Sequence, residues 1–127
     1  MAKTAPSIKP TAAELNLLRV LWQLGPATVK QAHLAMQAER ADITYATVLR
    51  QMQLMHAKGL LTRDETQRSH VYAPAQSQNA LQTNLLKELI HKAFAGSGKA
   101  LVLAALRGHV TKEERDEIQE FLHGEDQ

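Results

Sequence analysis

Hydrophobic residues recur at helical spacing in three segments of the first half of the chain, over residues 11–24, 28–40 and 44–59. The first two segments open with a capping-box pattern, at Thr11 and Thr28, in which a hydroxyl is followed three residues later by Glu or Gln. Thr44 is suited to cap the third segment, which ends at a glycine. This pattern predicts three helices.

Two short segments with strand character follow, over residues 60–63 and 70–72. The polar run 64–69 separates them, which predicts a small antiparallel hairpin with a solvated tip. Pro74 closes this unit of the chain. Three helices followed by a two-stranded hairpin is the order of a winged helix–turn–helix domain, and we assign it to residues 11–75.

The second half of the chain predicts three further helices that are rich in leucine, within residues 78–95, 99–107 and 111–123. These helices cannot bury all their apolar faces among themselves. They need either the first domain or a second copy of the chain, and we favour the copy. The residues expected to form the dimer are Leu85, Leu89, Phe94, Leu101, Leu103, Leu106, Ile118, Phe121 and Leu122.

The 127 residues are therefore expected to form a mainly α protein with a small β-hairpin, in three parts. Residues 1–10, which contain two prolines and no periodicity, are expected to be a flexible N-terminal tail. Residues 11–75 form the winged-helix domain, and residues 76–127 form a helical dimerisation domain.

Composition excludes several classes of protein. There is no cysteine, which rules out disulfides, thiolate metal sites and a cysteine nucleophile. No apolar run approaches the ~20 residues that cross a bilayer, and the N-terminus lacks a signal-peptide core. We therefore expect a cytoplasmic protein without membrane insertion. The six histidines form no metal-binding motif and no catalytic constellation is present, so we expect no enzyme activity, no metal and no cofactor.

Charge is distributed unevenly along the chain. Residues 1–74 carry nine Lys/Arg against five Asp/Glu, a balance of +4, whereas residues 75–127 carry six against eight, a balance of −2. A basic first half favours an anionic partner for the winged-helix domain, although an imbalance of this size also arises by chance.

The third predicted helix has one face without any acidic residue. A helical projection places Tyr45, Val48, Leu49, Met52 and Met55 on the inward side, and Ala46, Thr47, Arg50, Gln53, Leu54, Ala57 and Lys58 on the other. A helix that enters the DNA major groove needs such a face, because phosphates line the groove. Arg50 is suited to guanine, Gln53 to adenine and Thr47 to thymine, and Arg63 and Arg68 of the hairpin tip fit either the backbone or the minor groove. The competing interpretation is an ordinary solvated helix face.

The chain also resembles a known family. The residues that carry the resemblance are Leu15, Leu18, Leu21-Trp22, Gly25, Thr28-Val29, Tyr45-Ala46-Thr47-Val48, Lys58-Gly59-Leu60, Arg68 to Pro74, Phe94 to Ser97 and Glu113-Glu114. Their order and spacing resemble the penicillinase and methicillin-resistance repressors of the BlaI/MecI type over about residues 11–123. The resemblance implies a repressor of transcription that binds a palindromic operator in double-stranded DNA as a homodimer.

Family contacts transfer residue by residue. The resemblance implies base contacts at Ala46, Thr47 and Arg50, and phosphate or supporting contacts at Thr28, Tyr45, Lys58 and Arg68. From the residues alone, Tyr45 fits either the core or a phosphate contact. Leu54 either touches a thymine methyl or packs on the second helix.

Three departures from the family stand out. Leu54 replaces a frequent arginine, and His70 replaces an aromatic residue, so a different operator is expected. Ala104-Ala105 occupies the place of the Asn-Phe pair that is cleaved in antibiotic-responsive members, so release through a membrane sensor protease stays open. The cysteine-rich metal hook of the copper-responsive members is absent. The alternative function is a winged-helix module for protein–protein contact without DNA.

Overall fold

The computed structural model describes residues 9–125. The chain divides into two compact units, one ending at Thr83 and the other beginning at Asn84. Of the expected N-terminal tail, residues 1–8 lie outside the described residues. Pro10, at the other end of that predicted tail, is buried.

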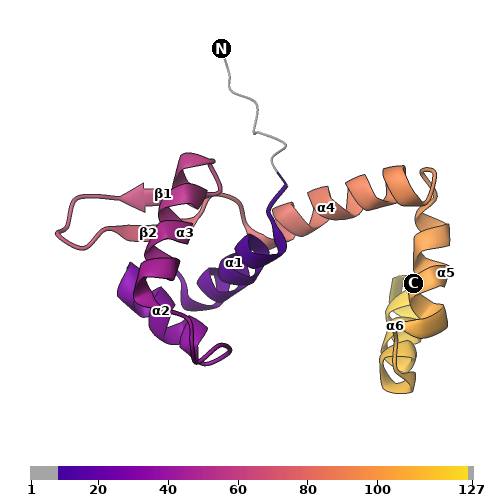
Figure 1. Cartoon of the computed structure of the whole chain (residues 1–127). Helices are drawn as coiled ribbons and strands as arrows, with labels where there is room; N and C mark the ends of the chain where they lie inside the picture. Colours follow the sequence, from indigo (N-terminus) through magenta and orange to yellow (C-terminus); the bar gives the residue numbers. More distant parts are fainter. Residues whose placement is uncertain (1–8, 126–127) are drawn as a thin grey trace, which may run out of the picture. The chain divides into compact units, whose positions relative to one another are not determined.

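The first unit contains three helices and a hairpin in the predicted order. The helices are α1 (Ala12–Leu24), α2 (Val29–Gln37) and α3 (Tyr45–Ala57), and the strands are β1 (Leu61–Asp64) and β2 (Val71–Pro74). In Figure 1 the two strands extend away from the helices as a narrow ribbon that ends in a loop. The predicted fold class, mainly α with a small hairpin in a winged-helix arrangement, is confirmed.

A threonine hydroxyl caps the N-terminus of each of these three helices, as the sequence predicts. The Oγ1 atom of Thr11 accepts a hydrogen bond from the N–H of Glu14 at 3.1 Å, and Thr28 accepts from Gln31 at 3.2 Å. Both capping boxes are complete, because the Glu14 and Gln31 side chains accept from the backbone N–H of their cap residues at 2.9 Å. Thr44 caps α3 in the same way, through the N–H of Thr47 at 3.1 Å. These bonds satisfy backbone donors that a helix leaves without partners.

The helices α1 and α2 end in different ways at their C-termini. Gly25 ends α1 with a φ of 84°, a conformation that costs glycine little. The helix α2 ends at Gln37, three residues before its predicted end near Arg40, and a turn continues the chain.

The core of the first unit joins the inward faces of the three helices to the base of the hairpin. Its most deeply buried large side chains are Leu17, Leu21, Val48, Met52, Met55 and Tyr72. The burial of Met52 and Met55 confirms their predicted place on the inward side of α3, and Met36 of α2 is buried as well.

Backbone pairing places the hairpin beside the start of α2. The strands β1 and β2 pair antiparallel, with Arg63 opposite Tyr72, and Pro74 is the last residue of β2 rather than a residue beyond it. On its other side, Tyr72 exchanges two backbone hydrogen bonds with Ala27, at 2.8 and 2.9 Å. Because Ala27 immediately precedes Thr28, this bridge holds the N-cap of α2 next to the wing.

The helix α4 (Gln78–Ala93) crosses the boundary between the two units. Its first turns belong to the first unit, where Leu81 is buried. Just before α4, the carbonyl of Gln76 accepts a hydrogen bond from the indole N–H of Trp22 at 3.0 Å. The first compact unit therefore extends several residues beyond the position 75 at which the sequence analysis divides the chain.

The second unit continues with α5 (Gly98–Gly108) and α6 (Lys112–Glu125). Ser97 caps α5, and a capping box of Thr111 and Glu114 opens α6 with bonds of 2.9 and 3.0 Å. No described residue of α5 or α6 is buried. Within the described part of the chain, no single helix is long and apolar enough to cross a membrane, and α4 and α5 pass that test only as a bent pair.

Candidate nucleic-acid interface

The outward face of α3 lies open to solvent. Ala46, Thr47, Arg50, Gln53 and Leu54 are all exposed on this face. The opposite side of the helix holds Val48, Met52 and Met55, which have no exposed surface. The whole helix from Tyr45 to Ala57 contains no acidic residue. The structure therefore brings together, on one accessible and carboxylate-free surface, the side chains that the sequence assigns to base recognition.

Arg50 lies in the middle of this face. Within residues 9–125, no hydrogen bond or ion pair engages its guanidinium. Leu54 is half exposed, and it shares a hollow of about 280 Å³ with Met36 and Arg40 from the α2 side. Leu54 is thus neither buried against α2 nor fully separate from it.

Tyr45, the first residue of α3, is not a core residue. Its side chain is 47% exposed, and its ring meets His33 of α2 edge-on, with centroids 5.9 Å apart. The helical projection that placed Tyr45 on the inward side is wrong here, because the first turn of α3 extends past the edge of the core. The phosphate contact at Tyr45 stays a prediction.

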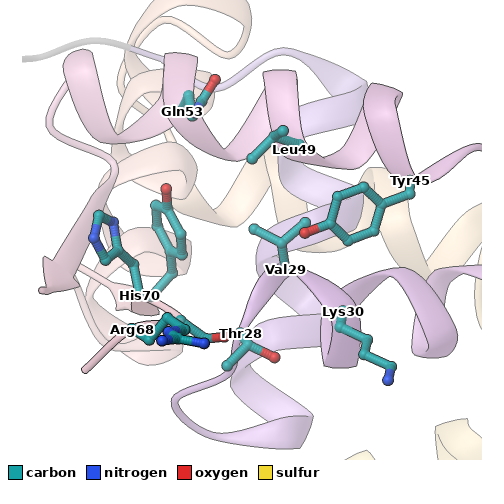
Figure 2. A pocket seen from close by; sticks show the side chains of 10 residues that line it. Thr28, Val29, Lys30, Tyr45, Leu49, Gln53, Arg68 and His70 are labelled. Atoms are coloured by element: carbon teal, nitrogen blue, oxygen red, sulfur yellow. The ribbon is translucent and has the colours of Figure 1, made fainter.

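A polar hollow of about 240 Å³ lies between α2, α3 and the hairpin. Figure 2 shows Tyr45 and Leu49 on α3 at one side, Thr28, Val29 and Lys30 in the first turn of α2 at the other, and Arg68 and His70 arriving from the hairpin. Gln53, Ser69 and Tyr72 complete the lining. Four residues predicted from the sequence therefore meet in one place: Thr28, Tyr45, Gln53 and Arg68.

Sequence reasoning missed the contribution of Lys30, Ser69 and His70 to this hollow. A signal for Lys30 was present, because a residue two positions after an N-cap lies in the exposed first turn of a helix. No comparable local signal exists for Ser69 and His70, since the backbone pairing of Ala27 with Tyr72 is what brings the hairpin to α2.

The charges around the hollow suit an anion. Lys30 and Arg68 are exposed, and no ion pair within the described residues neutralises either of them. The N-terminal end of α2, which carries partial positive charge, begins at the same place. Cationic side chains and hydrogen-bond donors next to a helix N-terminus are the groups that bind phosphate oxygens.

The side chain of Lys58, for which the family resemblance implies a phosphate or supporting contact, pairs with α1. Its ammonium donates a hydrogen bond to Oε2 of Glu14 in α1 at 2.7 Å, and the Glu14 side chain is only 10% exposed. Burial by itself raises the pKa of the Glu14 carboxyl. Hydrogen bonds from Lys58 and Thr11 outweigh burial and hold this pKa below its ordinary value.

The carboxylates of the hairpin are engaged within the hairpin itself. Glu65 pairs with Arg63 at 2.6 Å, and this hydrogen-bonded pair lowers the pKa of Glu65. Asp64 accepts hydrogen bonds from the N–H and the hydroxyl of Thr66 at 2.9 and 2.8 Å, which lower its pKa. The pKa of Arg63 is raised by its hydrogen bonds to Tyr72 and Glu65. Of the two hairpin arginines, Arg68 is thus the one that no described residue pairs with.

The residues expected to form a dimer all keep solvent-accessible surface. Leu89, Leu103, Phe121 and Leu122 are between 40 and 65% exposed. Leu85, Phe94, Leu101, Leu106 and Ile118 are half-buried. Among the described residues no group of three or more His, Asp or Glu side chains is placed to hold a metal ion.

The family model and the two sequence relatives agree on one family. The family model described as penicillinase repressor matches residues 10–124. Two relatives, each named transcriptional regulator BlaI and each from a strain of Mycobacterium tuberculosis, are 29% identical over 103 residues, which is 80% of this chain and 74% of theirs. A solved structure of a mutant of ZitR from Lactococcus lactis is 17% identical, with a TM-score of 0.43, and it covers 98% of this chain and 78% of that one.

Proposed function

This chain belongs to the penicillinase repressor family and is a transcriptional regulator of the BlaI type, and from that premise we propose that it binds a palindromic operator in double-stranded DNA as a homodimer. Bound there, the dimer represses transcription by occupying the promoter. Each copy reads one half of the operator with α3 in the major groove.

The observation that carries this proposal is the exposed, carboxylate-free face of α3, with the guanidinium of Arg50 at its centre and without a partner among residues 9–125. Phosphates on both sides of the major groove repel carboxylates, so a helix that enters the groove must present such a face. A guanidinium without an intramolecular partner can donate two parallel hydrogen bonds to O6 and N7 of guanine at no cost in broken ion pairs.

Neighbouring side chains on this face have complementary roles. Gln53 carries an amide that matches adenine, and Ala46 and the methyl group of Thr47 offer apolar contact to a thymine methyl. The hydroxyl of Thr44 donates to Oγ1 of Thr47 at 2.9 Å, which leaves the Thr47 hydroxyl hydrogen for a DNA acceptor.

The hollow beside α3 is proposed to hold a backbone phosphate next to the base contacts. Lys30, Arg68 and the hydroxyl of Tyr45 surround it, and Thr28 lies at the start of α2. Contacts of this kind fix the register of the protein on the duplex and provide most of the salt-dependent affinity. Lys58, which is paired with Glu14, is left out of this set.

The second unit is proposed to form the dimer. Its helices leave large apolar side chains exposed, most of all Phe121 and Leu122, and a monomer gains nothing by presenting them to water. A single winged helix makes too few contacts for both affinity and specificity. Linking two half-site contacts in one dimer raises the effective concentration of the second contact.

Binding to DNA from the region upstream of this chain's own gene tests the proposal. Fluorescence anisotropy measures the affinity of each protein for that duplex and for a scrambled duplex of the same composition. The proteins are the wild type, Arg50→Ala and Arg107→Ala. The last variant is a matched control, since it removes an equal charge from α5 in the second unit. We expect Arg50→Ala to lose roughly 5- to 150-fold of the preference for the upstream duplex, which is the worth of one bidentate base contact.

Two results would contradict the proposal. An equal loss on both duplexes would limit Arg50 to a phosphate contact. A wild-type protein that binds neither duplex at moderate salt would favour the alternative of a winged-helix module for protein–protein contact.

A further inference from the structure

His33 connects α2 to the segment that leads into α3. Its Nε2 atom lies 2.9 Å from the backbone carbonyl oxygen of Ile43. A carbonyl oxygen only accepts hydrogen bonds, so the geometry requires that Nε2 carries the hydrogen. Ile43 directly precedes Thr44, the N-cap of α3. The imidazole therefore holds the backbone two residues before Tyr45, the first residue of the proposed recognition helix.

The segment between the two helices is longer than usual. It spans residues 38–44, whereas helix–turn–helix motifs commonly use turns of about three or four residues. The tip of the segment is exposed from Ala38 to Asp42. A longer turn has more conformations available to it, so the start of α3 needs additional contacts to be held in one position.

Three contacts hold the end of this segment. The side chain of Ile43 is buried, its N–H donates to the carbonyl of Arg40 at 3.1 Å, and its carbonyl accepts from His33. The bond from His33 is the one among them that reaches from the body of α2 to the backbone entering α3. The same imidazole ring also packs edge-on against Tyr45, at an interplanar angle of 87°.

We propose that His33 is a positioning residue for DNA recognition, and that its hydrogen bond to Ile43 sets where α3 begins relative to α2. The proposal rests on the proposed function, because the property it explains is operator binding. A shift of the first turn of α3 moves Tyr45, Ala46 and Thr47 together, while the buried residues Val48 and Met52 retain the helix in the core. Loss of the bond should therefore weaken sequence reading more than folding.

Two substitutions separate the hydrogen bond from the ring contact. His33→Gln keeps an N–H donor at a similar reach and removes the ring. His33→Phe keeps a ring against Tyr45 and removes the donor. Leu34→Ala is the matched control, because Leu34 is the next residue of α2 and its side chain is 59% exposed. All three variants are first checked for an unfolding midpoint well above the temperature of the binding assay.

We expect His33→Phe to bind the upstream duplex about five- to tenfold more weakly, the fold-change that corresponds to the net contribution of one hydrogen bond. Binding to the scrambled duplex should change by less than about twofold, because the cations proposed to contact phosphate, Lys30 and Arg68, lie on α2 and the hairpin and not on the first turn of α3. His33→Gln and Leu34→Ala should stay within about twofold of the wild type on both duplexes. Three results would each overturn the proposal. The affinity of His33→Phe for the upstream duplex equals that of the wild type, His33→Phe loses as much affinity for the scrambled duplex, or His33→Gln loses as much affinity as His33→Phe.

Amide hydrogen exchange in the free protein gives a readout that needs no DNA. We expect the amides of residues 38–44 to exchange faster in His33→Phe than in the wild type, and at the wild-type rate in His33→Gln. Unchanged exchange in His33→Phe would overturn the positioning role. If the wild type shows no preference for the upstream duplex, the proposed function fails, and the exchange rates still decide whether His33 holds the start of α3.

Discussion

The ammonium of Lys58 lies 2.7 Å from Oε2 of Glu14, and this ion pair joins the C-terminal end of α3 to the first turn of α1. The other oxygen of the same carboxylate accepts from the backbone N–H of Thr11 at 2.9 Å. One side chain therefore caps α1 and holds the far end of the proposed recognition helix. Polar contacts from His33 and from Glu14 thus act at the two ends of α3, in addition to its buried face.

Glu14→Gln should lower the free energy of unfolding by about 1–2 kcal/mol at neutral pH, because hydrogen bonds to a charged group in a largely buried site are lost or weakened. Thermal or urea unfolding followed by circular dichroism measures this change. Glu39→Gln, at an exposed position that has no ion pair within the described residues, should leave stability unchanged. A stability equal to that of the wild type in Glu14→Gln would show that the pair contributes nothing.

The same pair predicts a pH dependence of stability. Since the pKa of Glu14 in the folded protein lies below its ordinary value of 4.5, the unfolded chain takes up this proton more readily than the folded one. The stabilisation is present above the ordinary pKa and is lost as the pH falls through the folded pKa. Unfolding midpoints measured from pH 7 downwards should therefore fall less steeply for Glu14→Gln than for the wild type, and parallel curves would contradict this prediction.

Lys30, Lys58 and Arg68 should differ in how much each contributes to the salt dependence of DNA binding. Each phosphate contact adds about 0.9 to the slope of log K against log salt concentration. We expect Lys30→Gln and Arg68→Gln each to reduce the slope by about that amount. Lys58→Gln should leave it unchanged, because Glu14 engages the Lys58 ammonium. A slope reduced equally in Lys58→Gln would return this residue to the DNA contacts.

Phe121→Glu should disrupt the proposed dimer. Phe121 is 65% exposed on α6, and a carboxylate buried without a partner at an interface costs several kcal/mol. We expect dimerisation to weaken by about 100-fold or more in sedimentation experiments, and operator affinity to fall with it. Gln119→Glu is the control, because a spacing of two residues places Gln119 on the other side of α6. A wild-type protein that sediments as a monomer at micromolar concentration would contradict the dimer itself.

The turn between α4 and α5 contains a strained alanine next to a glycine. Ala95 has a φ of 50°, in the left-handed region that is costly for a residue with a Cβ atom, and Gly96 has a φ of 84°. Ala95→Gly should raise the free energy of unfolding by about 0.5–1 kcal/mol, and Gly96→Ala should lower it by about 1 kcal/mol. Opposite shifts of the thermal unfolding midpoint would verify the backbone conformation, and two shifts of the same sign would contradict it.

Much of the first unit could be predicted because its signals are local. The caps at Thr11, Thr28 and Thr44 depend on hydrogen bonds between residues three positions apart, and such bonds are visible in the sequence. The buried stripe of α3 follows from the helical repeat. The face that carries Arg50 follows as its complement, which is why the sequence identified the proposed base-reading residues.

Tyr45 shows where the helical repeat stops being informative. Periodicity assigns a residue to a side of a helix, but it does not say how far the neighbouring core extends along that helix. Tyr45 lies on the apolar side and beyond the end of the core, so its ring is half exposed against His33. Only the packing of α2 against α3 decides this.

The sequence by itself determined the order of the elements, their caps and the carboxylate-free face, because these depend on residues within one or two helical turns of each other. The tertiary structure decided which groups meet: the amide bridge of Ala27 with Tyr72 that brings the hairpin to α2, and the pairing of Lys58 with Glu14 across 44 positions of sequence. Contacts at such separations arise from the shared burial of apolar faces, and burial brings together residues that no local pattern connects.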